Sequence, residues 1–91
     1  MGHLIKPMGQ LDQHFSVVQF FSDGHWSYVR RELPPEDAVH LAKRVTEGPL
    51  ARTGDVARVI ITDDSDFCVF EWQYGQGVTF PPTTQEMPMK R

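Results

Sequence analysis

Three aspartates between two apolar runs are the residues whose type and spacing first suggest chemistry. Asp63, Asp64 and Asp66 lie in the stretch RVIITDDSDFCVFEW, residues 58–72. Carboxylates this close together can share a divalent cation, but a calcium loop of the EF-hand type also needs a glycine at its bend and a distant bidentate glutamate. The stretch lacks that glycine and continues directly into an apolar run. We therefore interpret the three aspartates as a solvated turn and expect no metal site.

The other reactive side chains are isolated from one another. The sequence has one cysteine, Cys68, and four histidines with no pair at helical i, i+4 spacing: His3, His14, His25 and His40. Without a Cys-x-x-Cys motif, zinc is poorly supported. Cys68 is expected to face the core, where no histidine can activate it as a nucleophile. Gly75-Gln76-Gly77 lacks the following helix that a phosphate-binding loop requires. We expect no catalytic residue, no cofactor and no enzymatic activity.

Bulk composition sets the class of protein. The 91 residues, 40% hydrophobic and 23% charged, correspond to one small globular domain. The net charge of −3 argues against a binder of the phosphate backbone, which needs a basic face. One cysteine allows no internal disulfide, which favours the cytoplasm. No apolar run is long enough to cross a membrane, and the N-terminus does not resemble a secretion signal. We expect a flexible arm over residues 1–13, one domain over 14–80 and a flexible tail over 81–91.

The dipeptide Asp23-Gly24 predicts a first β-hairpin, over residues 15–21 and 26–33. A two-residue type I′ turn there would pair Phe21 with Trp26, Val18 with Val29 and Val17 with Arg30. Both faces of this hairpin would then be apolar. One face would carry Phe15, Val17, Phe21, Trp26 and Tyr28, and the other Val18, Phe20, Val29 and Leu33.

A helix is predicted over residues 36–47, after Pro34-Pro35 ends the second strand. Acidic residues at its start favour a helix N-terminus, and Gly48-Pro49 ends it. The period places Ala38, Leu41, Ala42 and Val45 on one face, and Glu36, His40, Lys43 and Glu47 on the opposite face. A short extra turn is possible over residues 50–52.

Residues 58–72 predict a second hairpin with Asp64-Ser65 at its tip. Asp63 would then pair with Asp66, and one face would be entirely apolar, with the pairs Ile61–Cys68, Val59–Phe70 and Ala57–Trp72. The other face would hold Thr62–Phe67, Ile60–Val69 and the opposite-charge pair Arg58–Glu71. A short fifth strand is possible at residues 78–80.

The expected fold is α+β, with order ββαββ. Two hairpins would join by antiparallel pairing into a four-stranded sheet, with one helix packed on one face. One helix cannot cover both faces, so large apolar groups should remain outside unless the arm, the tail or Phe80 covers them.

Four short motifs carry a resemblance to a known group of proteins. They are DGxxxYVRR at residues 23–31, RVIITD at 58–63, FEW at 70–72 and GxGVTFP at 75–81. Together they resemble a group of short uncharacterised bacterial proteins. The resemblance implies the hairpin–helix–hairpin architecture and brings no activity or catalytic residue with it.

The surplus of apolar side chains favours a non-enzymatic module that binds another protein or a second copy of itself through the outer sheet face. The candidate binding residues are Phe15, Phe21, Trp26, Tyr28, Ile60, Phe67 and Val69. The alternative is binding of single-stranded nucleic acid, with bases stacked on Trp26, Tyr28 or Phe67, although the acidic balance argues against nucleic acid as a partner. A ligand pocket between helix and sheet is the third hypothesis, but no convergent polar residues support it. No membrane partner is expected.

Overall fold

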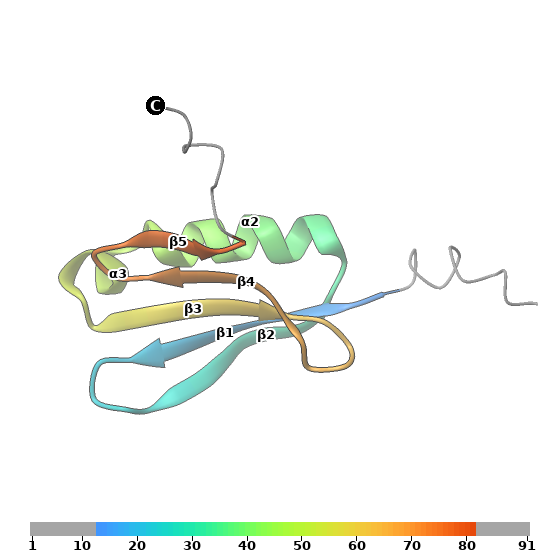
Figure 1. Cartoon of the computed structure of the whole chain (residues 1–91), viewed down its shortest axis with the longest axis horizontal. Helices are drawn as coiled ribbons and strands as arrows, with labels where there is room; N and C mark the ends of the chain where they lie inside the picture. The colour runs from blue at the N-terminus through green and yellow to red at the C-terminus, as the bar shows by residue number, and fades with distance from the viewer. Residues whose placement is uncertain (1–12, 82–91) are drawn as a thin grey trace, which may run out of the picture.

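The computed structural model describes residues 13–81, which form one antiparallel sheet with helices on one face (Figure 1). The strands are β1 (Phe15–Phe21), β2 (Trp26–Leu33), β3 (Val56–Thr62), β4 (Cys68–Gln73) and β5 (Gly77–Phe80), and the helices between β2 and β3 are α2 (Pro35–Thr46) and α3 (Pro49–Thr53). The sheet order is β2-β1-β3-β4-β5.

The predicted α+β class and the antiparallel sheet are confirmed. The expected four strands and one helix are corrected to five strands and two helices, because residues 77–80 pair with β4 and residues 49–53 form a helix of their own. The two hairpins join by antiparallel pairing, as predicted, and the strands that meet are β1 and β3. The proposed arm and tail lie outside the described residues, apart from Gln13 and Pro81.

The first hairpin closes with a three-residue loop, so the predicted type I′ turn is wrong. The Gly24 N–H donates to the Phe21 carbonyl (3.0 Å), which places Ser22 and Asp23 at the tip, and only Gly24 has a positive φ, +98°. This is a turn followed by a left-handed residue, a common alternative hairpin loop. The His25 N–H donates to the Asp23 carboxylate at 3.0 Å and, together with the His25 ring, lowers the pKa of that carboxyl. The Asp23 side chain therefore stabilises the loop by hydrogen bonding, and the Asp23 backbone does not take a left-handed conformation.

The longer loop shifts the register of the first hairpin by one residue. Phe20 lies opposite Trp26, and Val18 lies opposite Tyr28. Trp26 and Tyr28 are therefore on the face opposite to Phe21, contrary to the prediction, because a one-residue slip turns every side chain over. An irregularity in the ladder between Val17 and Val18 restores the predicted pairing of Val17 with Arg30. Phe15, Val17 and Phe21 pack toward the helices with Val29 and Leu33.

The second hairpin has the predicted tip but a different register. The Asp66 N–H donates to the Asp63 carbonyl (3.0 Å), so Asp64 and Ser65 form the tip, and Asp66 takes a left-handed φ of +66°. Asp63 pairs with Phe67 instead of Asp66. An extra residue in β4, Val69, increases the total shift of the register from one residue to two. The ladder pairs are Ile61–Phe70, Val59–Trp72 and Thr62–Cys68.

An even shift keeps most side chains on their predicted faces. Phe70 and Trp72 still face the helices, but Cys68 lies opposite Thr62 and is half-buried rather than in the core, which corrects the expectation for this thiol. Val69, the extra residue, turns to the helix side and is no longer opposite Ile60. Arg58 and Glu71 are diagonal neighbours, not directly opposite, yet they still form an ion pair.

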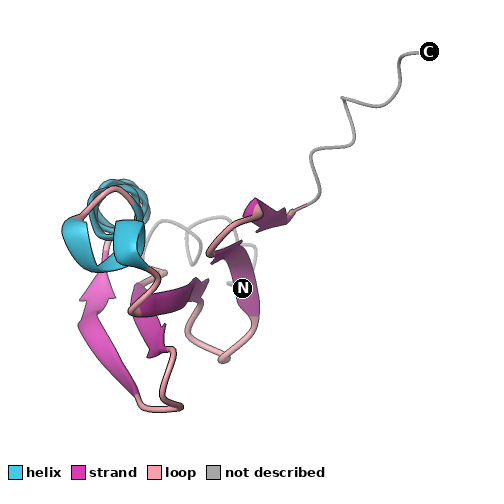
Figure 2. Cartoon of the chain, turned by 90° about the vertical axis from the view of Figure 1, so that its left-hand side faces the viewer, coloured by secondary structure: helices cyan, strands magenta, loops and turns pink. Residues whose placement is uncertain are grey.

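The helices lie over one half of the sheet, and the strand that leads to the C-terminus lies away from them (Figure 2). α2 begins at Pro35 with Glu36 and Asp37 in its first turn, and its predicted stripe is confirmed by Ala38 and Ala42, which are buried. α2 packs on β1 and β3, and α3 packs on β3. The buried core consists of Val17, Ala38, Ala42, Ala51, Val56, Val59 and Ile61.

Candidate functional site

The helix layer is narrower than the sheet. Neighbouring strands lie about 4.8 Å apart, so five strands span about 19 Å, whereas a helix with its side chains is about 10 Å wide. Because α2 packs on β1 and β3, the inner face of β4 and β5 is left beside it without a helix above it.

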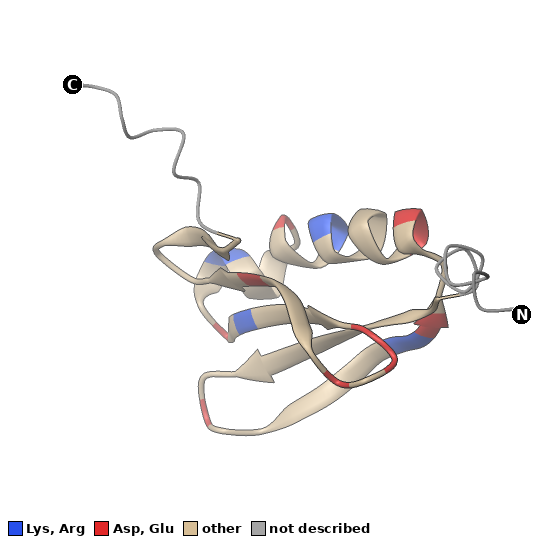
Figure 3. Ribbon diagram, turned by 45° about the vertical axis from the view of Figure 1, so that its right-hand side comes forward, with Lys and Arg blue, Asp and Glu red and all other residues tan. Residues whose placement is uncertain are grey.

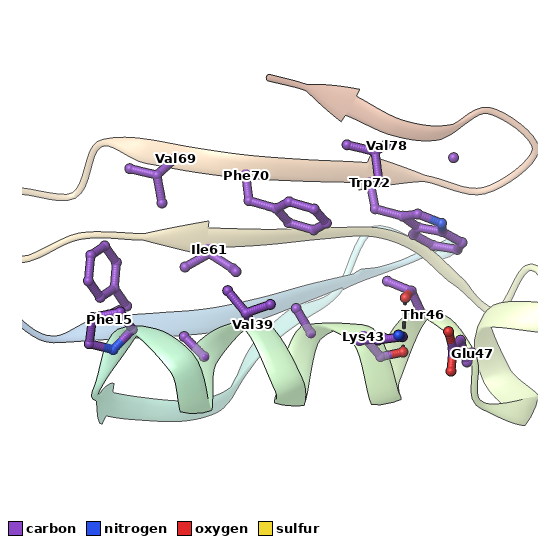
Figure 4. A pocket seen from close by; sticks show the side chains of 14 residues that line it. Phe15, Val39, Lys43, Thr46, Glu47, Ile61, Val69, Phe70, Trp72 and Val78 are labelled. Atoms are coloured by element: carbon purple, nitrogen blue, oxygen red, sulfur yellow. Dashed lines mark hydrogen bonds between the residues drawn. The ribbon is translucent and has the colours of Figure 1, made fainter. Parts of the chain in front are cut away.

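An apolar groove of about 630 Å³ lies between the flank of α2 and the inner face of β4 and β5 (Figure 4). We call it the α2–β4 groove. Its floor is formed by Ile61, Phe70 and Trp72, and one wall is the flank of α2 around Val39. Its remaining lining is Phe15, Pro35, Ala38, Ala42, Lys43, Thr46, Glu47, Val69, Gly77 and Val78.

Strand alternation and a helix flank bring these side chains together. Phe70 and Trp72 are two residues apart in β4 and point to the same side. Val78 lies opposite Trp72 in the edge strand β5. Val39 lies on the flank of α2 next to its buried stripe and is 57% exposed. The groove is thus an open apolar surface on the same side of the sheet as the core.

The polar residues of the groove are at one end. Lys43, Thr46 and Glu47 lie there, and the Thr46 hydroxyl already donates to the Lys43 carbonyl at 3.1 Å (Figure 4). The lining contains no histidine, cysteine or serine. Within residues 13–81, no three His, Cys, Asp or Glu side chains are grouped to hold a metal ion. The groove is suited to bind apolar side chains.

A row of aromatic rings crosses the opposite, outer face of the sheet. The Phe20 and Trp26 ring centroids are 6.4 Å apart, and those of Trp26 and Tyr28 are 5.7 Å apart in an edge-to-face arrangement. The Arg58 guanidinium lies 4.7 Å from the Phe20 centroid, and that of Arg31 lies 4.6 Å from the Tyr28 centroid. Trp26 is 56% exposed and Tyr28 41%, so two of these rings are open to solvent.

An ion pair occupies the centre of the outer face. The Arg58 Nε donates to the Glu71 carboxylate, and the Thr79 hydroxyl donates to the other carboxylate oxygen at 2.9 Å. The Arg58 hydrogen bond is the main cause that lowers the pKa of Glu71, against a smaller opposing effect of burial. Glu71 therefore stays charged and neutralises Arg58 at neutral pH.

The seven candidate residues do not form a single surface. Trp26 and Tyr28 lie together on the outer face, with Ile60 on the same face but only 9% exposed. Phe67 lies in the β3–β4 loop and is 69% exposed. Phe15, Phe21 and Val69 lie on the helix side, and Phe15 and Val69 line the groove.

Of the groove residues, sequence reasoning proposes only Phe15 and Val69 for binding, and among those it misses are Val39, Phe70, Trp72 and Val78. Phe70 and Trp72 were assigned to the core under the helix, and Val39 to no face. The available signal was the width of the sheet, because the possible fifth strand already exceeded what one helix can cover.

Among the three aspartates at residues 63–66, Asp63 has a local structural role (Figure 3). One Asp63 carboxylate oxygen accepts the Ser65 N–H at 2.8 Å and the Phe67 N–H at 3.0 Å. Asp64 accepts only a long bond from the His14 N–H, at 3.4 Å. Asp63 therefore holds the β3–β4 loop through its side chain, as short polar residues do in turns.

Comparison of the chain with protein-family models, with curated proteins and with solved structures gives no match. The resemblance to short uncharacterised bacterial proteins therefore stays a prediction. Over residues 13–81, no helix has the length and apolar character needed to cross a membrane.

Proposed function

We propose that this chain is a non-enzymatic interaction module that binds an apolar segment of another polypeptide in the α2–β4 groove. The observation that carries the proposal is an open apolar groove of about 630 Å³ with its polar residues at one end. Apolar surface of this kind is costly to leave in water, and large exposed patches mark interaction sites. This is the binding function expected from the sequence, with the binding surface on the helix side of the sheet instead of the outer face.

A selection from a random peptide library tests this function. Peptides are selected on the wild-type chain and then measured against Val39→Glu, which places a charge on the groove wall, and against Leu50→Glu. Leu50 is a matched control because it is 50% exposed on α3 and does not line the groove. We expect selected peptides that bind the wild type and Leu50→Glu equally and lose affinity for Val39→Glu. Failure to select any peptide with this dependence would refute the proposal.

Self-association through the outer face is the second form of the interaction, and the exposed Trp26–Tyr28 pair favours it. Sedimentation at two concentrations tests it directly. A mass that rises toward a dimer in the wild type and stays monomeric in Trp26→Glu supports it. A strict monomer at high concentration removes it.

Binding of single-stranded nucleic acid remains the alternative for the same rings, because Arg31 stacks on Tyr28 beside an open aromatic surface. Two features weigh against it: Arg58 is neutralised by Glu71, and the net charge is −3. A salt titration with a labelled oligothymidine decides the question, since no binding at low salt excludes this function.

A further inference from the structure

We draw no further inference here: the strongest candidate, the apolar α2–β4 groove between the flank of α2 and the inner face of β4 and β5, belongs to the site already described, and nothing in the structure shows what covers it.

Discussion

Replacing Arg58 by methionine should destabilise the sheet by removing the charge partner of Glu71. The Glu71 side chain is only 18% exposed and the Arg58 side chain is 41% exposed. Hydrogen bonds to charged groups contribute about 1.5–3 kcal/mol when buried, whereas exposed pairs contribute at most about 1 kcal/mol. Because this pair is partly exposed, we expect Arg58→Met to lower the free energy of unfolding by about 1–2 kcal/mol at neutral pH.

The pH dependence of this effect has a defined sign. Arg58, with help from Thr79, lowers the pKa of Glu71 below its ordinary 4.5 in the folded protein, so the unfolded chain takes up the proton more readily. The stabilisation is therefore fully present above pH 4.5 and is lost as the pH falls through the folded pKa. The gap in stability between wild type and Arg58→Met should shrink at about pH 3.

Urea unfolding of four proteins measures the pair: the wild type, Arg58→Met, Glu71→Gln and the double variant. The double-mutant cycle removes the separate loss of the Arg58–Phe20 contact. We expect a coupling of about 1 kcal/mol at pH 7. A coupling below about 0.3 kcal/mol, or a gap that stays unchanged at pH 3, would refute the assignment of the lowered pKa to this pair.

Three further comparisons test local features. Asp63→Ala should lower the free energy of unfolding by about 1–2 kcal/mol, because two loop N–H groups lose their acceptor. Asp64→Ala should change the free energy of unfolding by less than about 0.5 kcal/mol. Equal effects of the two substitutions would contradict the role of Asp63. Gly54→Ala should cost more than Gly75→Ala in thermal unfolding: both have positive φ, but a Cβ at residue 54 would lie 3.1 Å from the Tyr74 ring while one at residue 75 meets nothing within 4 Å. Val39→Glu and Leu50→Glu should each leave the melting temperature nearly unchanged, since both side chains are at least half exposed. A large decrease in the melting temperature of either variant would contradict these exposures.

Local patterns predicted the elements well. The stripe of Ala38 and Ala42 placed the helix to within a residue, because helical period and its proline and glycine boundaries depend on neighbours in the chain. The alternation in β3 and β4 placed Val59, Ile61, Phe70 and Trp72 on the helix side, and this survived a shift of two residues because side chains alternate with period two.

Loop length was the main source of error. Asp23-Gly24 fits a two-residue turn and also the end of a three-residue loop, and the observed hydrogen bond from the His25 N–H to Asp23 favours the second. That one residue moved Trp26 and Tyr28 to the outer face and separated them from Phe15 and Phe21. Irregularities such as the one beside Val69 depend on how several strands fit together, so no local pattern predicts them.

The groove follows from the connection between β2 and β3. Both strands are antiparallel to β1 and flank it, so they are parallel to each other. Parallel strands need a crossover, and a helix in that crossover must pass over the strand between them. α2 is therefore held over β1 and β3, whatever follows in the sequence. β4 and β5 add to the sheet on the far side of β3, beyond the reach of that helix. Apolar residues on their inner face, Trp72 and Val78 above all, are then left uncovered by the crossover helix, and this is the physical basis of the proposed binding site.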